Sequence, residues 1–448
     1  MFEIVGYSEI ETNAVNVYKA LANATNCHNY GDIRNVTKDS VNTEIDLLVG
    51  GSPCTDFSSA GLGAGCMYIC THCNHSFNPL TISRRNRNNC PRCGKRIEEK
   101  TRSSLLMEYL RVVKETKPKL FIWENVKSVA THKKYKSTYN LFISELKSYG
   151  YNVYTHFTNA LDYGIPQNRE RVFLIGIYRF YDTTVVNLSN RGYRNINIAD
   201  ILQPASEIQD NLWLSDIGAT DIEIIQRIKN ECTKSKVQRV YDKTGYLPLV
   251  FGLRNTADLH RIPCITTNSN SPSGDGAVII KQNNRIRKIS VKECFSAMGF
   301  SNDDYDKINA LNLSDRIARQ LAGNSIVIDV LVSLYHDLYQ SQPHLFNDNM
   351  RVLSVCSGIG AFESALQQFY STYYKYNNVP ISANRYTVDN CLLQYDDLIP
   401  TIEVCNILQI HRHTLQALVE SNKLDREVHK NKYYITKSSL LAYLNKAY

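Results

Sequence analysis

The chain has 448 residues, of which 43% are hydrophobic, so it can bury the cores of two or three domains. Its net charge of +8 is compatible with a polyanionic partner but does not identify one. The N-terminus lacks the basic and apolar regions of a secretory signal, and no apolar run suggests a membrane span, so we expect neither a secreted nor a membrane protein. The 13 cysteines fit a reducing cytoplasm better than a disulfide scaffold.

Two apolar segments near the N-terminus predict strands with polar groups at their ends. Residues 2–11 predict a strand that ends in acidic residues, among them Glu9. The run 45–50 predicts a buried strand, and Cys54 follows it behind a proline. Ligands and chemistry collect at the carboxyl ends of strands in open α/β sheets. Because a lone cysteine is most often a small buried hydrophobe, Cys54 by itself is only a candidate nucleophile.

Two Cys-x2-Cys pairs, separated by sixteen residues, have the spacing of a four-cysteine zinc ribbon: Cys70, Cys73, Cys90 and Cys93. Cys66 is a spare cysteine, and His72 and His75 are weak alternative ligands. A polar loop of this length could hardly fold without a metal, so we expect a structural zinc ion whose binding contributes local folding energy.

Two later strands bring an acid and two arginines. The run 120–123 predicts a strand that ends at Glu124, and the run 172–177 is preceded by Arg169 and Arg171. Taken alone, each of these three residues could have a purely structural role. A thiol, a carboxylate and paired guanidinium groups at the edge of one sheet together indicate a catalytic site.

The rest of the chain carries fewer signals. Residues 186–284 contain no catalytic motif, whereas the segment 351–369 predicts a strand, a turn with Gly358 and Gly360, and a helix. A lone Gly-x-Gly is a weak signal on its own. After a polar stretch, residues 399–448 resemble small winged helix-turn-helix domains of the excisionase type, and this unit either binds DNA or is purely structural.

Five motifs in order resemble those of the C5-cytosine DNA methyltransferases: residues 53–58 (nucleophile), 124–126 (acid), 167–171 (Gln-x-Arg-x-Arg), 287–300, and 323–325 (Gly-Asn-Ser). The resemblance covers most of residues 1–186 and 285–369. There is one large departure, because the cofactor motif that normally opens these enzymes lies at residues 352–362. We therefore expect a circularly permuted member of the family, since rejoining nearby chain ends leaves the sheet and its core unchanged.

The resemblance implies an α/β fold with a Rossmann-like, S-adenosylmethionine-dependent methyltransferase sheet. The expected domains are the first part of the core at 1–185 with the zinc ribbon inserted at 66–98, a target recognition domain at 186–284, the second part of the core at 285–370, a linker at 371–398, and a winged helix-turn-helix-like domain at 399–448. Arg254, Asn255, Asn268 and Asn270 are suitable readers of base edges within the recognition domain.

The resemblance also implies a mechanism for methylation of C5 in a flipped cytosine of double-stranded DNA. Cys54 would attack C6 as a thiolate, and Glu124 would hold a proton against ring N3. Arg171 would hold the cytosine O2, with Arg169 supporting it.

S-adenosylmethionine is the implied cofactor. Glu9 fits the ribose, Ile10 the adenine face, and Asp32, next to Ile33, the adenine amino group. The other implied cofactor residues are Pro53, Leu105, Asn324, Ser325, Cys356, Ser357, Gly358 and Gly360. Cys356 stands where the family usually has a phenylalanine, which puts cofactor affinity in doubt.

The expected partner is double-stranded DNA, and a cognate restriction endonuclease is a further candidate. Between Cys66 and Arg102 eight basic residues face two acids, so we expect Arg84, Arg85 and Arg87 to contact phosphates, although a solvated surface would also tolerate such charge. We expect a monomer in the cytoplasm of a bacterial or phage-infected cell, serving restriction-modification or phage anti-restriction. Two alternatives stay open, namely a tRNA cytosine-5 methyltransferase of the same fold and a catalytically idle DNA-binding regulator.

Overall fold

The computed structural model describes residues 2–22, 24, 26–52, 66–97, 105–189, 196–216, 261–267, 278–283 and 285–374, a few residues between 219 and 226, and short stretches between 398 and 440. The chain divides into two compact units, Met1–Gln367 and Gln368–Tyr448. Pro53, Cys54 and the four predicted base readers lie outside the described residues.

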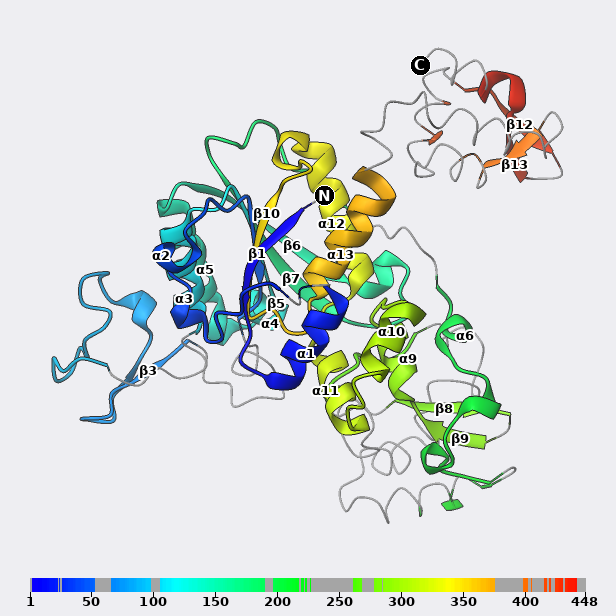
Figure 1. Cartoon of the computed structure of the whole chain (residues 1–448), viewed down its shortest axis with the longest axis horizontal. Coiled ribbons are helices and arrows are strands. Elements are labelled where there is room, and N and C mark those ends of the chain that lie inside the picture. The colour runs from blue at the N-terminus through cyan, green and yellow to red at the C-terminus, as the bar shows by residue number, and fades with distance from the viewer. Residues whose placement is uncertain are drawn as a thin grey trace. The chain divides into compact units, whose positions relative to one another are not determined.

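The first unit is built on a six-stranded sheet (Figure 1). Its strands are β1 (Glu3–Ser8), β2 (Leu47–Gly50), β5 (Leu120–Val126), β6 (Tyr151–Asn159), β7 (Glu170–Tyr178) and β10 (Arg351–Val355), in the order β1-β10-β2-β5-β7-β6. The first four strands of this order are parallel, and β7 runs antiparallel to both neighbours. β10 comes from the far end of the sequence, yet it lies between β1 and β2.

The strands form because their side chains are apolar on both faces. All four residues of β2 and the first four of β5 are buried, which is the pattern of parallel strands covered by helices on both sides. On one face α3 (Leu105–Thr116) and α5 (Lys133–Ser148) contribute to a core that contains Phe121 and Trp123. On the other face lie α1 (Thr12–Leu21), α12 (Ile328–Ser341) and α13 (Ala361–Phe369) (Figure 1).

Ion pairs fix β10 to its neighbours at the amino-terminal edge of the sheet. The Arg351 backbone N and Nε each lie 2.9 Å from Asp46 Oδ2, and Lys119 Nζ lies 2.6 Å from Asp46 Oδ1. Burial opposes ionisation of Asp46, but the bonds from Arg351 and Lys119 outweigh it and lower the pKa of this carboxyl. The central position of β10 is therefore supported by charge as well as by packing.

A smaller group of elements lies between β7 and β10 in the sequence. It contains α6 (Ile198–Ile201), β8 (Ile279–Gln282), β9 (Arg285–Lys288), α9 (Val291–Ser296), α10 (Asn302–Asn309) and α11 (Asp315–Asn324). Arg287 and Glu293 form a fully buried pair, with Nη1 to Oε2 at 2.8 Å and Nη2 to Oε1 at 2.6 Å, which joins β9 to α9.

Short elements complete the two units. The first unit contains α2 (Lys38–Val41), α4 (Ser128–Thr131), β3 (Tyr68–Ile69), β4 (Ser76–Phe77) and 3-10 turns at Ile33–Asn35, Pro79–Thr81, Ala160–Tyr163, Ala205–Glu207, Asp210–Leu212 and Pro343–Leu345. The second unit has a π-helical turn at Tyr370–Tyr374 and an antiparallel sheet of β11 (Leu398–Pro400), β13 (Lys432–Thr436) and β12 (Arg426–His429). The β12–β13 hairpin lies within residues 399–448, the segment that resembles a winged helix-turn-helix domain.

One described stretch, Asp315–Ser341, reaches the length and hydropathy of a membrane span, which corrects the expectation that no run does so. Most of this stretch is buried inside the fold, and Ser325 interrupts it between α11 and α12. These are features of a core segment.

Candidate active site

At the carboxyl edge of the sheet, the end of β2 closely approaches both β10 and β5. A Cβ atom added to Gly50 would lie 2.1 Å from the Val355 carbonyl oxygen, and one added to Gly51 would lie 2.8 Å from the Glu124 carbonyl oxygen. Real Cβ atoms essentially never make such contacts, so glycines at these two positions let the end of β2 lie this close to Val355 and Glu124.

Ser52 is fixed against the end of β5, immediately before the predicted nucleophile segment. Asn125 Nδ2 donates to the Ser52 carbonyl oxygen at 2.9 Å, and Trp123 Nε1 donates to Ser52 Oγ at 3.3 Å. Asn125 is 1% exposed, so its amide needs these partners. The chain therefore enters the Pro53–Cys54 segment beside Glu124, although the two residues themselves lie outside the described part.

Glu124 pairs with Arg171 at this edge. The Arg171 Nε lies 2.9 Å from Glu124 Oε1. Burial raises the pKa of Glu124, and the charges of Arg171 and Arg169 counteract only part of this effect. Glu124 therefore holds a proton at a higher pH than an ordinary glutamic acid, which suits a hydrogen-bond donor to a ring nitrogen.

Arg169 lies immediately before β7 and binds backbone carbonyls of two distant segments. Its Nη1 donates to the Ile265 carbonyl oxygen at 2.8 Å, and its Nη2 donates to the carbonyl oxygens of Gly323 at 3.0 Å and Ser325 at 2.5 Å. The guanidinium is thus occupied by backbone carbonyls, and burial lowers its pKa to about 10. These contacts are those of a positioning residue that joins the start of β7 to two distant segments, and the predicted support of Arg171 by Arg169 stays a prediction.

The end of β1 meets the turn after β10. The Gly358 backbone N donates to Glu9 Oε2 at 2.8 Å, and the Ser357 backbone N donates to the Ser8 carbonyl oxygen at 3.1 Å. Gly358 has a φ of +56°, and a Cβ atom added to it would meet nothing within 4 Å. The turn therefore leaves open space against the backbone, which fits the close approach of a cofactor.

The loop that carries Asp32 is bound to Glu9 through Asn29. Asn29 Nδ2 donates to the Glu9 carbonyl oxygen at 3.0 Å, while its Oδ1 accepts from the Gly31 backbone N at 3.0 Å. Burial, followed by the charges of Glu9 and Asp32, raises the pKa of the Cys356 thiol to about 12. Three predicted cofactor residues, Glu9, Asp32 and Cys356, are therefore neighbours, and a group with hydroxyl and amino donors fits their two carboxylates. Sequence reasoning missed Asn29, whose surroundings in the sequence carry no motif.

Five further predicted cofactor residues differ in how exposed their side chains are. Ile10 is 70% exposed, as an apolar contact for a ligand would be. Asn324 is exposed at the end of α11, whereas Ser325 is buried. Leu105 begins α3 and is partly buried, and Ile33 lies in the core, so Ile33 is a support for its loop rather than an open contact.

The four predicted metal ligands lie together. The Sγ atoms of Cys70, Cys73, Cys90 and Cys93 all lie within 4.8 Å of one another. The pairs Cys70–Cys93 and Cys73–Cys90 are each 3.6 Å apart. Four bonds of about 2.3 Å in a tetrahedron give sulfur separations of about 3.8 Å, so the cluster fits a zinc ion.

Both turns of this ribbon have the same backbone form. The Asn74 backbone N donates to the Cys70 carbonyl oxygen at 2.8 Å, and the Gly94 backbone N donates to the Cys90 carbonyl oxygen at 2.8 Å. Asn74 and Gly94 both have positive φ, of 53° and 71°. His72 and His75 are not in the cluster, and Cys66 is buried, with a pKa raised by burial to about 12.

Two of the three predicted phosphate contacts have another partner. Arg84 Nε lies 2.9 Å from Glu145 Oε2, and Arg87 Nη2 lies 2.6 Å from Glu145 Oε1. These bonds dock the ribbon on α5, and Arg87 is largely buried there. Arg84, whose side chain is 50% exposed, and Arg87 therefore have a partner within the chain, and their predicted contact with DNA stays a prediction. Among the three, only Arg85 is exposed without a partner in the described part of the chain.

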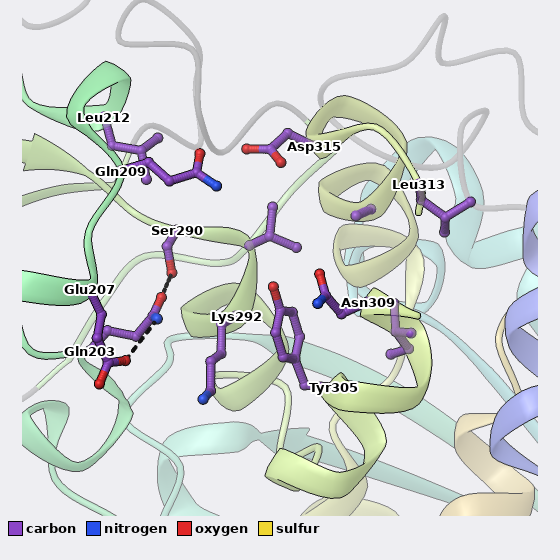
Figure 2. Close-up of a pocket in the computed structure, with 13 residues that line it drawn as sticks. Gln203, Glu207, Gln209, Leu212, Ser290, Lys292, Tyr305, Asn309, Leu313 and Asp315 are labelled. Atoms are coloured by element: carbon purple, nitrogen blue, oxygen red, sulfur yellow. Dashed lines mark hydrogen bonds between the residues drawn. The ribbon is translucent and has the colours of Figure 1, made fainter. Parts of the chain in front are cut away.

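A separate cavity of about 130 Å³ lies between the segment 203–212 and the helices α9, α10 and α11 (Figure 2). Ser290 Oγ lies 2.5 Å from Gln203 Oε1 on its wall, and Lys292 and Tyr305 also line it. None of the predicted catalytic or cofactor residues lines this cavity. It plays no part in the site at the sheet edge.

The sheet order and the site at its carboxyl edge define a Rossmann-like methyltransferase of the S-adenosylmethionine-dependent class. A match to the C-5 cytosine-specific DNA methylase family covers residues 1–67 and 92–340, and the chain belongs to this family. It is a DNA (cytosine-5-)-methyltransferase. A helix-turn-helix domain matches residues 401–448.

Relatives agree with this assignment, and a solved structure agrees with the fold. The orphan methyltransferase M.SPBetaI of Bacillus phage SPbeta is 25% identical over 413 residues, which cover 75% of this chain and 92% of that protein. The type II methyltransferase M.Bsp6I of Bacillus sp. (strain RFL6) is 25% identical over 341 residues, which cover 76% of this chain and 92% of that protein. The crystal structure of a mutant DNMT2 from Spodoptera frugiperda has a TM-score of 0.50 at 16% identity, covers 75% of this chain and 92% of that chain, and supports the fold alone.

Proposed function

We propose that this enzyme methylates C5 of a flipped cytosine in double-stranded DNA, with Cys54 as nucleophile, Glu124 as acid and Arg171 as the group that holds the base. The observation that carries this proposal is the partly buried Glu124–Arg171 pair beside Ser52, which precedes Cys54 by two residues in the sequence. Because the relatives include an orphan methyltransferase of a phage and a type II methyltransferase, the proposed setting is restriction-modification or phage anti-restriction.

The chemistry follows from these residues. The Cys54 thiolate adds to C6 of the ring while Glu124 donates its proton to N3, so C5 becomes an electron-rich enamine carbon. S-adenosylmethionine, when bound, supplies the methyl group that C5 accepts. A water molecule then takes the C5 proton, sulfur leaves C6 as the Cys54 thiolate, and N3 returns its proton to Glu124, which restores the ring. A positioned acid such as Glu124 contributes roughly 10²–10⁴-fold to the rate.

Glu9, Asp32 and the backbone at Gly358 are the proposed holders of the cofactor. This assignment requires the segment 351–369 to belong to the same site as residues 9–32, and it underlies the proposed circular permutation. The position of β10 between β1 and β2 supports it, as does the end of the family match at residue 340.

A substitution tests the cofactor assignment. Gly358→Ala should lower the affinity for S-adenosylmethionine in calorimetry, because the added Cβ occupies the open space beside the turn. Gly94→Ala in the ribbon is the matched control, since Gly94 also has positive φ and open surroundings. Normal cofactor affinity in the Gly358 variant would argue against the permuted site.

We further propose that the four-cysteine cluster holds one structural zinc ion. Elemental analysis of the purified chain should give one zinc per molecule, and Cys73→Ser with Cys93→Ser should abolish it. A chain without zinc, but with a normal unfolding transition, would contradict this assignment.

Analysis of the methylated nucleic acid distinguishes the proposed function from its two alternatives. Bisulfite sequencing of host DNA after expression should reveal cytosines that are methylated in one sequence context by the wild type and not by Glu124→Gln. Methylated tRNA with unmethylated DNA would favour the tRNA enzyme, and no methylated product at all would favour an idle DNA-binding regulator.

A further inference from the structure

The first half of α5 is strongly basic. Residues 125–144 contain Lys127, Lys133, Lys134 and Lys136 and no aspartate or glutamate. Lys133 and Lys136 are exposed, and within the described parts of the chain neither has an ion-pair partner. Lys127 differs, because its Nζ lies 2.5 Å from Glu170 Oε1.

The fold holds this basic segment at the catalytic edge. β5 ends at Val126, the four-residue helix α4 follows, and α5 begins at Lys133. Four helical residues advance about 6 Å and three extended ones about 10 Å, so Lys133 lies within about 16 Å of the strand end. Tyr135 is 7% exposed and anchors this turn of α5 in the core, which fixes the direction of its exposed lysines.

Two arginines of the four-cysteine ribbon compensate the negative charge on α5. Glu145 is the only acidic residue of α5, and it is bound by Arg84 and Arg87. Burial opposes ionisation of Glu145, but its bond and charge interaction with Arg87 outweigh burial and lower its pKa, so it is ionised and its charge is compensated. The exposed surface of α5 therefore carries uncompensated positive charge alone.

We propose that Lys133 and Lys136 form a phosphate-contacting surface that seats duplex DNA over the catalytic edge. This inference rests on the proposed function, because a base that enters the site beside Glu124 brings its flanking backbone across the start of α5. Duplex DNA carries one charge per about 1.7 Å of its axis, so several phosphates pass within the reach of two lysine side chains. Contacts of this kind position the duplex and do not read its sequence.

The salt dependence of binding tests the proposal. Lys133→Gln with Lys136→Gln in the full chain should weaken binding to labelled duplexes of unrelated sequence by the same factor. Each lost phosphate contact lowers the slope of log K against log salt by about 0.9, so the pair should lower it by about 1.8 between about 50 and 200 mM salt.

Two controls isolate the charge at this place. Lys114→Gln with Lys117→Gln makes the same change in charge at exposed positions near the end of α3, at the opposite edge of the sheet, and should leave the slope unchanged. Lys133→Arg with Lys136→Arg keeps the charge and should restore the slope. Thermal unfolding midpoints equal to that of the wild type would exclude a folding defect.

Turnover separates this inference from the proposed function. The glutamine pair should methylate DNA at the wild-type rate when DNA is saturating, with a raised KM for DNA. If the glutamine variant methylates DNA and its salt slope equals that of the wild type, the two lysines do not contact phosphates. This result would overturn the inference and leave the proposed function intact. A wild type that binds DNA with this slope but does not methylate it would overturn the proposed function and leave the surface intact.

Discussion

Replacing Arg169 with methionine should destabilise the enzyme strongly, although Arg169 lies next to the catalytic edge. The substitution keeps most of the apolar stem but removes the donors to the carbonyl oxygens of Ile265, Gly323 and Ser325. A buried acceptor that loses a charged donor costs about 1–3 kcal/mol, so three of them amount to about 3–9 kcal/mol of unfolding free energy. Denaturant unfolding of the full chain, followed by intrinsic fluorescence, measures this loss.

Arg171→Met is the matched comparison. Arg171 contacts Glu124 and one backbone carbonyl, so its loss should reduce methyl transfer severely with a smaller effect on the unfolding midpoint. Arg169→Met therefore tests the effect on stability, whereas Arg171→Met tests the effect on turnover. An Arg169→Met variant as stable as the wild type would refute the assignment of Arg169 as a positioning residue.

Three further substitutions test other parts of the fold and site. The lowered pKa of Asp46 means that its pair with Arg351 stabilises the fold above about pH 4 and loses this effect on acidification. Arg351→Gln should therefore lower the thermal midpoint at neutral pH and make it depend less on acidification. A variant with the same midpoint as the wild type at every pH would contradict this. In Gly323→Ala the new Cβ would lie 2.4 Å from the Thr266 carbonyl carbon, so we expect a loss of about 1–3 kcal/mol in denaturant unfolding, and an unchanged midpoint would show that this contact relaxes freely. Because burial raises the pKa of Glu124 and the reaction needs its proton, single-turnover methylation should fall as pH rises through that pKa, and Glu124→Gln should be slower and lack this fall.

The sequence predicts the strand ends well because their signals are local. The buried runs that form β2 and β5 are continuous in sequence, so Glu124 could be placed at the edge of a sheet from its neighbours alone. The spacing of the Cys-x2-Cys pairs is equally local, since each pair forms one turn.

The partners of the arginines could not be predicted in this way. Arg169 binds carbonyls more than 90 residues away, and Arg84 and Arg87 bind a carboxylate about 60 residues away. A count of charges cannot distinguish an arginine that docks on Glu145 from one that faces a phosphate. Asn29 escaped notice for a similar reason, because its bonds to the Glu9 and Gly31 backbone depend on how two loops meet.

Covalent trapping tests the central claim most directly. DNA that carries 5-fluorocytosine in the methylated sequence has no C5 proton to lose, so the bond between Cys54 and C6 cannot be released after methyl transfer. With S-adenosylmethionine present, the wild type should form a protein–DNA adduct that survives denaturation, whereas Cys54→Ser should bind the same DNA and form none. An adduct in the Cys54→Ser variant, or none in the wild type, would contradict the mechanism.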